Sequence, residues 1–328
     1  MAILGSKTGD TGFPNILWQK STTWSPATSM ECIVYVIGGG GSGAISAENA
    51  NYSATGGGAG ATAISRLRLS SSVTYTVTVG AGGAGHTSDA HQAGNAGANS
   101  GFSGSDITDM TANGGAAGAI HSGAGGSGGA GGAAGSTGNI ANWAGGAGGT
   151  TTSTRSCTGG GAVGLWATGL TPTEESGTGD NGYPVGGNLS HYDRGGVTRE
   201  PTKPTDYLYP LPVSLTPFPE LFTYLQSDQN AYISGTNYND APLTYQAGMQ
   251  HVGEGLFPQG FTTSDTQFSA MPSPFIGGNG NKSNYTHIYG SKGCMGSGSG
   301  AIASNDTTMD AYAGAGGNGA VMLFPITL

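Results

Sequence analysis

The sequence predicts an all-β fold: a β-sandwich-like core joined to a bundle of polyglycine-II-type glycine-rich rods, with an irregular aromatic and proline-rich insertion. Three observations predict it. Glycine supplies 65 of the 328 residues, against a usual level of about 7%. Apolar segments with the periodicity of strands lie near both ends of the sequence. Prolines and tyrosines gather in one region between them.

The first and last predicted strands are apolar on both faces, as strands in the middle of a covered sheet are. They lie near 32–37, which runs directly into Gly38, and near 320–324, which Pro325 ends. We therefore expect these two strands to be neighbours in one sheet.

Two further strands, near 61–69 and 73–79, alternate apolar and polar residues. Leu67 and Leu69 fall on one face of the first, with Arg66 and Arg68 on the other. The second alternates valines and a tyrosine with threonines. The three serines at 70–72 between them predict a β-hairpin.

The glycine runs form a third kind of element. In the run 123–135, non-glycine residues recur at every third position, as in a three-residue-per-turn polyproline-II-like rod, but without the proline that collagen requires. Because the N–H and C=O groups of such a rod point outward, parallel rods can bond to one another. We expect glycine to be required where a Cβ would hold two rods apart. The runs are 38–43, 80–85, 114–118, 123–135, 145–149 and 314–319.

The composition changes between residues 165 and 290, where 12 of the 15 prolines and 10 of the 14 tyrosines lie. Proline restricts a loop and tyrosine supplies contact area at little entropic cost, a combination found in binding loops; loops that merely cover an underfilled core are the alternative. The predicted organisation is an N-terminal docking arm (1–29), a glycine-rich β domain (30–164 and 291–328) and the insertion (165–290).

Charge and motifs exclude several functions. With 10 basic and 19 acidic residues, the net charge of −9 argues against nucleic-acid binding. No apolar segment is long enough for a membrane span or a signal peptide. The sequence has three cysteines, Cys32, Cys157 and Cys294, that are far apart and cannot all pair within one chain, so we expect free thiols. The histidines have no metal-ligand spacing and the serine of Gly-Gly-Ser-Gly-Gly at 125–129 sits in a repeat, so we expect no enzyme, cofactor or metal.

Four motifs together resemble the glycine-rich domain of bacteriophage tail-fibre and adhesin-type virion proteins. They are Val-Tyr-Val-Ile-Gly-Gly-Gly at 34–40, Tyr-Thr-Val-Thr-Val-Gly-Ala-Gly-Gly-Ala-Gly at 75–85, Thr-Ala-Asn-Gly-Gly at 111–115 and Gly-Gly-Asn-Gly-Ala-Val-Met at 316–322. The resemblance covers about residues 30–165 and 290–328.

The resemblance implies a non-enzymatic virion structural protein, made in the host cytoplasm and placed on the virion surface. A tail-fibre or tail-tip adhesin that binds a host receptor is the first interpretation, and a capsid decoration, head-fibre or cement protein is the alternative. The implied partners are other virion proteins, a host surface glycan or protein, and further copies of the chain, with a trimer among the options. Neither nucleic acid nor membrane insertion is expected.

Two sets of residues are candidates for contact with partners. Trp18 and Trp24 lie on the predicted arm outside the sheet and are candidates for docking to a larger assembly, or else for capping the base of the sandwich. The insertion, which binds either the receptor or neighbouring subunits, carries the candidates Tyr207, Tyr209, Tyr224, Tyr232, Tyr238 and Tyr245. Tyrosine rings stack on sugars and their hydroxyls donate hydrogen bonds, which suits a neutral glycan.

Overall fold

The fold was analysed in a computed structural model. The structure describes residues 16–46, 51–88, 91–123, 125–152, 156–164, 168–169, 171–172, 267–268, 277, 280–283, 287–289, 292–293, 295–304 and 310–326. Within these residues every regular element is a strand. The all-β prediction is therefore confirmed.

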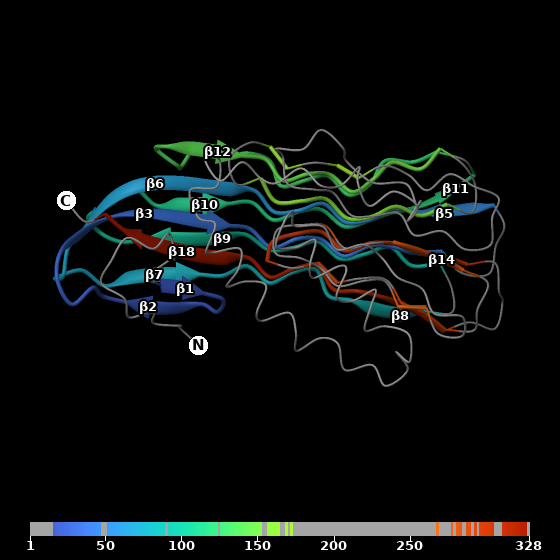
Figure 1. The fold of residues 1–328 in the computed structure, drawn as a ribbon, viewed down its shortest axis with the longest axis horizontal. Helices are drawn as coiled ribbons and strands as arrows, with labels where there is room; N and C mark the ends of the chain where they lie inside the picture. The colour runs from blue at the N-terminus through green and yellow to red at the C-terminus, as the bar shows by residue number, and fades with distance from the viewer. Residues whose placement is uncertain are drawn as a thin grey trace, which may run out of the picture.

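One end of the molecule is a sandwich of two antiparallel sheets (Figure 1). The five-stranded sheet has the order β1 (Ile16–Trp18), β18 (Ala320–Pro325), β3 (Met30–Ile37), β6 (Thr62–Leu69) and β12 (Ala141–Trp143). The four-stranded sheet has the order β10 (Met110–Ala112), β9 (Ser100–Ser103), β7 (Tyr75–Thr78) and β2 (Thr22–Trp24). We call this end the sandwich end.

The predicted pairing of the first and last strands is confirmed. β18 runs antiparallel to β3, with Val34 opposite Leu323 and Tyr35 opposite Met322. Both faces of this pair are covered because Val34 and Leu323 face the second sheet, whereas Tyr35 and Met322 belong to a separate core cluster on the other face. The double-sided apolar pattern thus marks the centre of the sheet.

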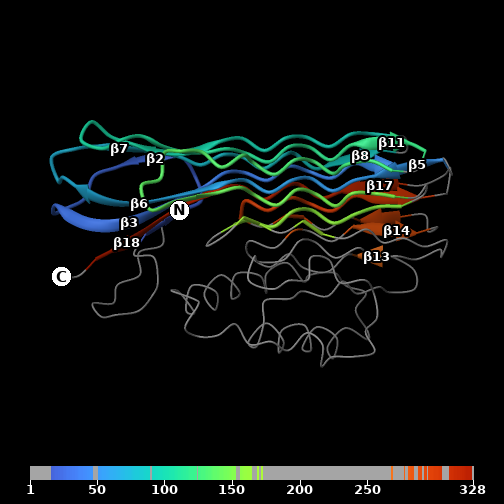
Figure 2. The ribbon, with the colours of Figure 1, turned by 90° about the horizontal axis from the view of Figure 1, so that it is seen from above.

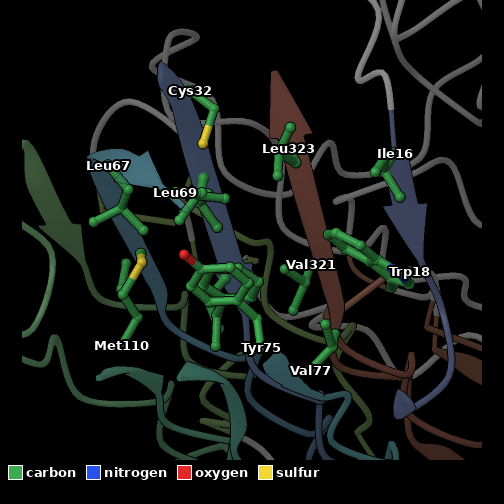
Figure 3. Packing of buried hydrophobic residues seen from close by; sticks show 14 of the residues in the cluster. Ile16, Trp18, Cys32, Leu67, Leu69, Tyr75, Val77, Met110, Val321 and Leu323 are labelled. Carbon is green, nitrogen blue, oxygen red and sulfur yellow. The ribbon is translucent and has the colours of Figure 1, made fainter. Parts of the chain in front are cut away.

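The core between the sheets is shown in Figure 3. Alternation places Leu67 and Leu69 of β6 in this core and leaves Arg66 and Arg68 exposed, as predicted. Tyr75 of β7 enters the same core from the opposite sheet. Large apolar side chains from both sheets therefore interlock across one layer.

The predicted hairpin between residues 61–69 and 73–79 is wrong. β6 pairs with β3 and β12, whereas β7 pairs with β9 and β2 in the other sheet. Both edges of β6 are already occupied, so the chain crosses from one sheet to the other through residues 70–74. The two strands have complementary alternation because they face each other across the core.

The opposite end of the molecule, which we call the far end, holds three small sheets (Figures 1 and 2). They are the sheet of β13 (Gln267–Phe268), β15 (His287–Tyr289), β17 (Asp310–Ala313) and β8 (His86–Ser88); the sheet of β14 (Asn281–Ser283), β16 (Ile302–Ser304) and β4 (Ile45–Ser46); and the pair of β11 (Ile120–Ser122) and β5 (Tyr52–Ala54). Four of their strand pairs are parallel: β13–β15, β15–β17, β14–β16 and β16–β4. The first and last described residues, Ile16 in β1 and Ile326 next to β18, both lie at the sandwich end.

Glycine runs cross the space between the two ends and lie side by side (Figure 2). The structure assigns no strand to them, and they bond to one another through backbone groups. We name them by residue number: 38–44, 55–61, 80–85, 92–99, 113–119, 126–134, 144–149, 158–163, 295–301 and 314–319. Four of them, 55–61, 92–99, 158–163 and 295–301, were not among the predicted runs.

Backbone donors in these runs repeat every three residues. In run 38–44 and the residue after it, the N–H groups of Gly38, Gly41 and Ala44 donate to run 55–61, and those of Gly39, Ser42 and Ile45 donate to run 92–99, at 2.8–3.1 Å. Further hydrogen bonds join run 38–44 to runs 80–85, 113–119, 295–301 and 314–319. Run 38–44 thus contacts six neighbours, as an interior rod of a packed bundle does.

Glycine is needed in this bundle mainly for space. Positive φ occurs at only three of the described glycines, Gly123, Gly125 and Gly296. A Cβ added to Gly57 would collide with the carbonyl group of Gly41, and one added to Gly128 would collide with that of Gly148. The expectation that a Cβ would hold neighbouring runs apart is confirmed.

The three-residue spacing in run 126–134 has a direct structural meaning. Gly129 and Gly132 donate their N–H groups to the carbonyl oxygens of Gly56 and Ala59. The non-glycine positions Ser127, Ala130 and Ala133 are exposed instead. Every third residue therefore lies on an outer edge of the bundle, where a side chain is tolerated.

Buried hydroxyl groups complete the bonding where glycine runs meet. The Ser299 hydroxyl accepts a hydrogen bond from the Gly43 N–H (2.8 Å) and donates one to the Gly314 carbonyl oxygen (2.7 Å). Thr158 links Gly56 and Gly149 in the same way. These side chains satisfy backbone groups that would otherwise be buried without partners, at a cost of about 1–3 kcal/mol each.

Candidate functional site

The candidate docking tryptophans lie inside the sandwich end. Trp18 is in β1, opposite Val321 of β18, and is only 3% exposed. Trp24 is in β2, opposite Tyr75, and is half-buried. The indole rings meet edge to face, 5.4 Å between centroids. The prediction that both tryptophans lie outside the sheets was wrong. β1 pairs with β18 and β2 pairs with β7, which buries apolar surface that a free arm would expose.

Trp18 is therefore occupied within its own chain, as in the alternative in which these residues cap the sandwich. The sequence signal was the apolar triplet Ile16-Leu17-Trp18 followed by the strand-forming Thr22-Thr23-Trp24. A docking role for the partly exposed Trp24 stays a prediction.

Tyr75 fixes the crossing between the two sheets. Its hydroxyl accepts a hydrogen bond from the Ser70 N–H and donates one to the Asp106 carboxylate, both at 2.8 Å. Its ring stacks on Phe102, with centroids 5.4 Å apart and planes 7° from parallel. Burial, helped by the bond to Asp106, raises the pKa of Tyr75 to about 12.

The six candidate tyrosines of the insertion, Tyr207, Tyr209, Tyr224, Tyr232, Tyr238 and Tyr245, lie outside the described residues. In the last part of the insertion, residues 267–268, 277, 280–283 and 287–289 are described, and they include three strands. β13 and β15 join the sheet of β17, and β14 joins that of β16. The insertion is thus attached to the far end through at least these strands.

An aromatic pair lies at the far end in residues that the sequence did not single out for binding. Tyr52 of β5 stacks on His91, with ring centroids 4.1 Å apart. Both side chains are half-buried. His121 of the adjacent β11 approaches the Ser127 carbonyl oxygen with its Nε2 (3.2 Å). No motif in the sequence predicts this arrangement, because β5, β11 and the loop with His91 are far apart in the sequence and come together only in the folded chain.

His86 also lies at this end, at the start of β8. Neither ring nitrogen makes a hydrogen bond of good geometry, although the backbone of Gln92 and Ala84 is near enough to favour the charged form slightly. Burial is the stronger influence and lowers the pKa of His86. Burial therefore favours the neutral form of the His86 ring over the charged form.

The described residues offer few candidates for a metal site or a reactive side chain. They contain no group of three or more His, Cys, Asp or Glu side chains arranged to hold a metal ion. Cys32 and Cys157 are buried cysteines, and burial beside Glu31 raises the pKa of the Cys32 thiol to about 12. Within the same residues, no helix has the length and apolar character to cross a membrane.

The glycine-rich sequence matches a known protein family. The family model of the glycine-rich domain matches residues 18–207, more than half of the chain. The chain belongs to the glycine-rich domain family. In this member, the matched residues run from the end of β1 through β12 and include the glycine runs from 38–44 to 158–163. β18, which lies between β1 and β3 in the five-stranded sheet, falls outside the match. No curated protein matches the chain.

Proposed function

We propose that this glycine-rich protein is a non-enzymatic structural protein of a bacteriophage particle, a tail-fibre or tail-tip adhesin on the virion surface. The observation that carries the proposal is the separation of the two ends by the glycine bundle. The sandwich end holds the first and last described residues, Ile16 and Ile326, and strands β14 and β15 of the insertion join the sheets of the far end. One end suits attachment to other virion proteins and the other suits contact with a host cell.

A bundle of bonded glycine runs suits this role as a spacer. Each interior run is held by several neighbours, so bending one run would break hydrogen bonds to all of them. We infer that the runs have the polyglycine-II conformation, because their donors repeat every three residues. Such a spacer holds the attached end and the presented end at a fixed separation.

The ligand in this proposal is a neutral surface glycan, and the contacts come from the tyrosines of the insertion. Tyrosine offers a flat apolar face to a sugar and a hydroxyl to its hydrogen-bonding groups. Individual contacts of this kind are weak, so several copies engaging one cell would supply an avidity gain of about 10² or more.

The test is to replace residues 205–245 by a short linker in the complete particle. The particle should assemble and show normal thermal stability, yet fail to adsorb to its host. A second variant with the six candidate tyrosines changed to serine keeps the chain length and should show the same loss. The control Thr76→Ala, on the exposed face of β7, should adsorb normally. Normal adsorption of both tyrosine-deficient particles would exclude the adhesin.

A capsid decoration or head-fibre protein is the second candidate. The observation in its favour is Ile140, which is 54% exposed and is the large apolar side chain left uncovered in the described part of the chain. A neighbouring subunit on a capsid would cover it. Under this alternative the replacement of 205–245 destabilises the particle instead of preventing adsorption.

A further inference from the structure

The loop before β12 is fixed by an unusual set of hydrogen bonds. Three side chains each bond to both the N–H and the C=O group of a single residue: Thr137 to Thr111 (2.9 and 3.0 Å), Asn139 to Arg66 (2.9 and 3.0 Å) and Asn142 to Gly138 (2.8 and 2.8 Å). The Asn139 N–H also donates to the Ser65 hydroxyl, and the Ile140 N–H donates to the Ile64 carbonyl oxygen. These hydrogen bonds hold the backbone of the loop against β6, β10 and its own residue Gly138.

The loop presents Ile140 to solvent. Its side chain is 54% exposed, although the residues on either side are hydrogen-bonded to β6 or lie in β12. Isoleucine is stiff at χ1 because it is β-branched. A contact made by Ile140 would therefore cost little conformational entropy on binding, which is the property of a preorganised interface anchor.

β12 itself is the last strand of the five-stranded sheet and has no described strand on its outer side. Natural proteins protect such an edge by keeping the strand very short, or with lysine, proline or inward-pointing charge. β12 is short, at three residues, but β12 and the loop contain no lysine, proline or charged residue, and the whole stretch from Met110 to Thr154 lacks Asp, Glu, Lys and Arg. Ala141, Asn142 and Trp143 of this edge are only half-buried.

We propose that the β12 edge, with Ile140 as its anchor, is a self-association surface that pairs with the same edge of a second copy of the chain. A strand edge is complementary to another antiparallel strand edge, and a two-fold contact between identical edges closes on itself as a dimer. The pairing would extend the sheet across both copies and cover Ile140 and the exposed side of Trp143. It is compatible with either an adhesin or a decoration protein.

The distribution of charge favours a second copy as the occupant. Two chains of net charge −9 repel each other over most of their surfaces. The β12 edge is free of charge, and the neighbouring Arg66 is balanced by its 3.0 Å ion pair with Glu31. Identical copies can therefore meet here without bringing like charges together.

The test measures association of the full chain by sedimentation equilibrium over a range of concentrations. Wild type should form dimers, and Ile140→Asp, which places two like charges in one contact, should weaken the dimer by at least about tenfold. Ala96→Asp adds the same charge to an exposed position of run 92–99 and should leave the dimer unchanged. Hydrogen exchange at residues 141–143 of wild type should slow as the concentration rises.

Three results would overturn the proposal: a wild-type chain that stays monomeric at its highest soluble concentration, an assembly that Ile140→Asp leaves intact, or exchange at residues 141–143 that does not depend on concentration. The Ile140 side chain is exposed, so we expect Ile140→Asp to fold normally. Should its melting temperature fall, Ile140→Ser and the exchange measurement on wild type decide the question.

Discussion

The N–H of Gly41 donates a 2.8 Å hydrogen bond to the carbonyl oxygen of Gly58, which joins runs 38–44 and 55–61. Next to this bond, Gly57 lies so close to Gly41 that a Cβ would overlap the Gly41 carbonyl group. Both runs bond to several other neighbours as well. A disturbance between them therefore spreads through the bundle.

Gly57→Ala should accordingly prevent folding to a soluble protein. The added methyl group has backbone rather than a flexible side chain against it, so relief requires moving a whole run and breaking its hydrogen bonds. Ala130→Ser, at an exposed position of run 126–134, is the control and should fold normally. Soluble yield and far-ultraviolet circular dichroism measure the result. A folded Gly57→Ala protein with wild-type stability would contradict the packing described for this pair.

Two positions in one run give a sharper comparison. Gly128→Val should abolish soluble folding because its Cβ would enter the contact with Gly148, whereas Ala130→Val adds comparable bulk on the exposed edge. We expect the Ala130 variant to melt within a few degrees of wild type. Equal effects of the two substitutions would show that position within the run does not matter.

Tyr75→Phe isolates the polar contribution at the crossing between the sheets. The variant keeps the stack on Phe102 and loses the hydrogen bonds to Ser70 and Asp106. The free energy of unfolding in urea should fall by about 1–2 kcal/mol, since water can reach the freed groups. Asp106→Asn keeps an acceptor for the hydroxyl and should cost less. A larger loss in Asp106→Asn than in Tyr75→Phe would place the stabilisation elsewhere.

The sequence predicted which segments are strands and which of their residues are buried. It predicted only some of the strand pairs. The pattern of β3 and β18 identified a central pair because both faces are apolar. Alternation in β6 and β7 gave the buried face of each strand but did not say whether the strands share a sheet. That depended on β12 and β2, short strands of three residues with little pattern of their own.

The glycine runs show the same division. Their composition and three-residue spacing predicted lateral bonding between runs, and the structure shows that the third residues, such as Ala130, lie on the outside of the bundle. The order of the runs in the bundle was not predictable, because glycine carries no side chain by which one run differs from another. The Tyr52–His91 pair was missed for a related reason: the two residues are brought together by that order.

Alkaline pH should destabilise the fold. Burial raises the pKa of Cys32 from 9.0, and those of Tyr35 and Tyr75 from 10.0, to about 12. The folded state therefore holds these protons more tightly than the unfolded state does. Their stabilising contribution is complete below about pH 9 and is lost as the pH rises towards about 12.

Urea unfolding between about pH 8 and about pH 11 measures this loss. Tyr35→Phe, which cannot ionise and keeps the edge-to-face contact with Phe324, should lose less stability over that interval than wild type. Parallel pH profiles of the two proteins would contradict the contribution assigned to Tyr35.

Mild acid should loosen the far end specifically. Burial lowers the pKa of His86 below its ordinary 6.5, so the unfolded ring takes up a proton at a pH where the folded ring does not. The contribution of this ring to stability is present above about pH 6.5 and is lost as the pH falls through the folded pKa. β8 pairs with β17, and His86 lies opposite Ala313. Amides of these two strands should therefore exchange faster at about pH 5.5 than at about pH 7.5, after correction for intrinsic rates.

In His86→Gln that difference should shrink, while β3 and β6 at the sandwich end stay protected in both proteins. Acid-dependent exchange that is uniform over both ends, or unchanged in His86→Gln, would assign the effect to other groups.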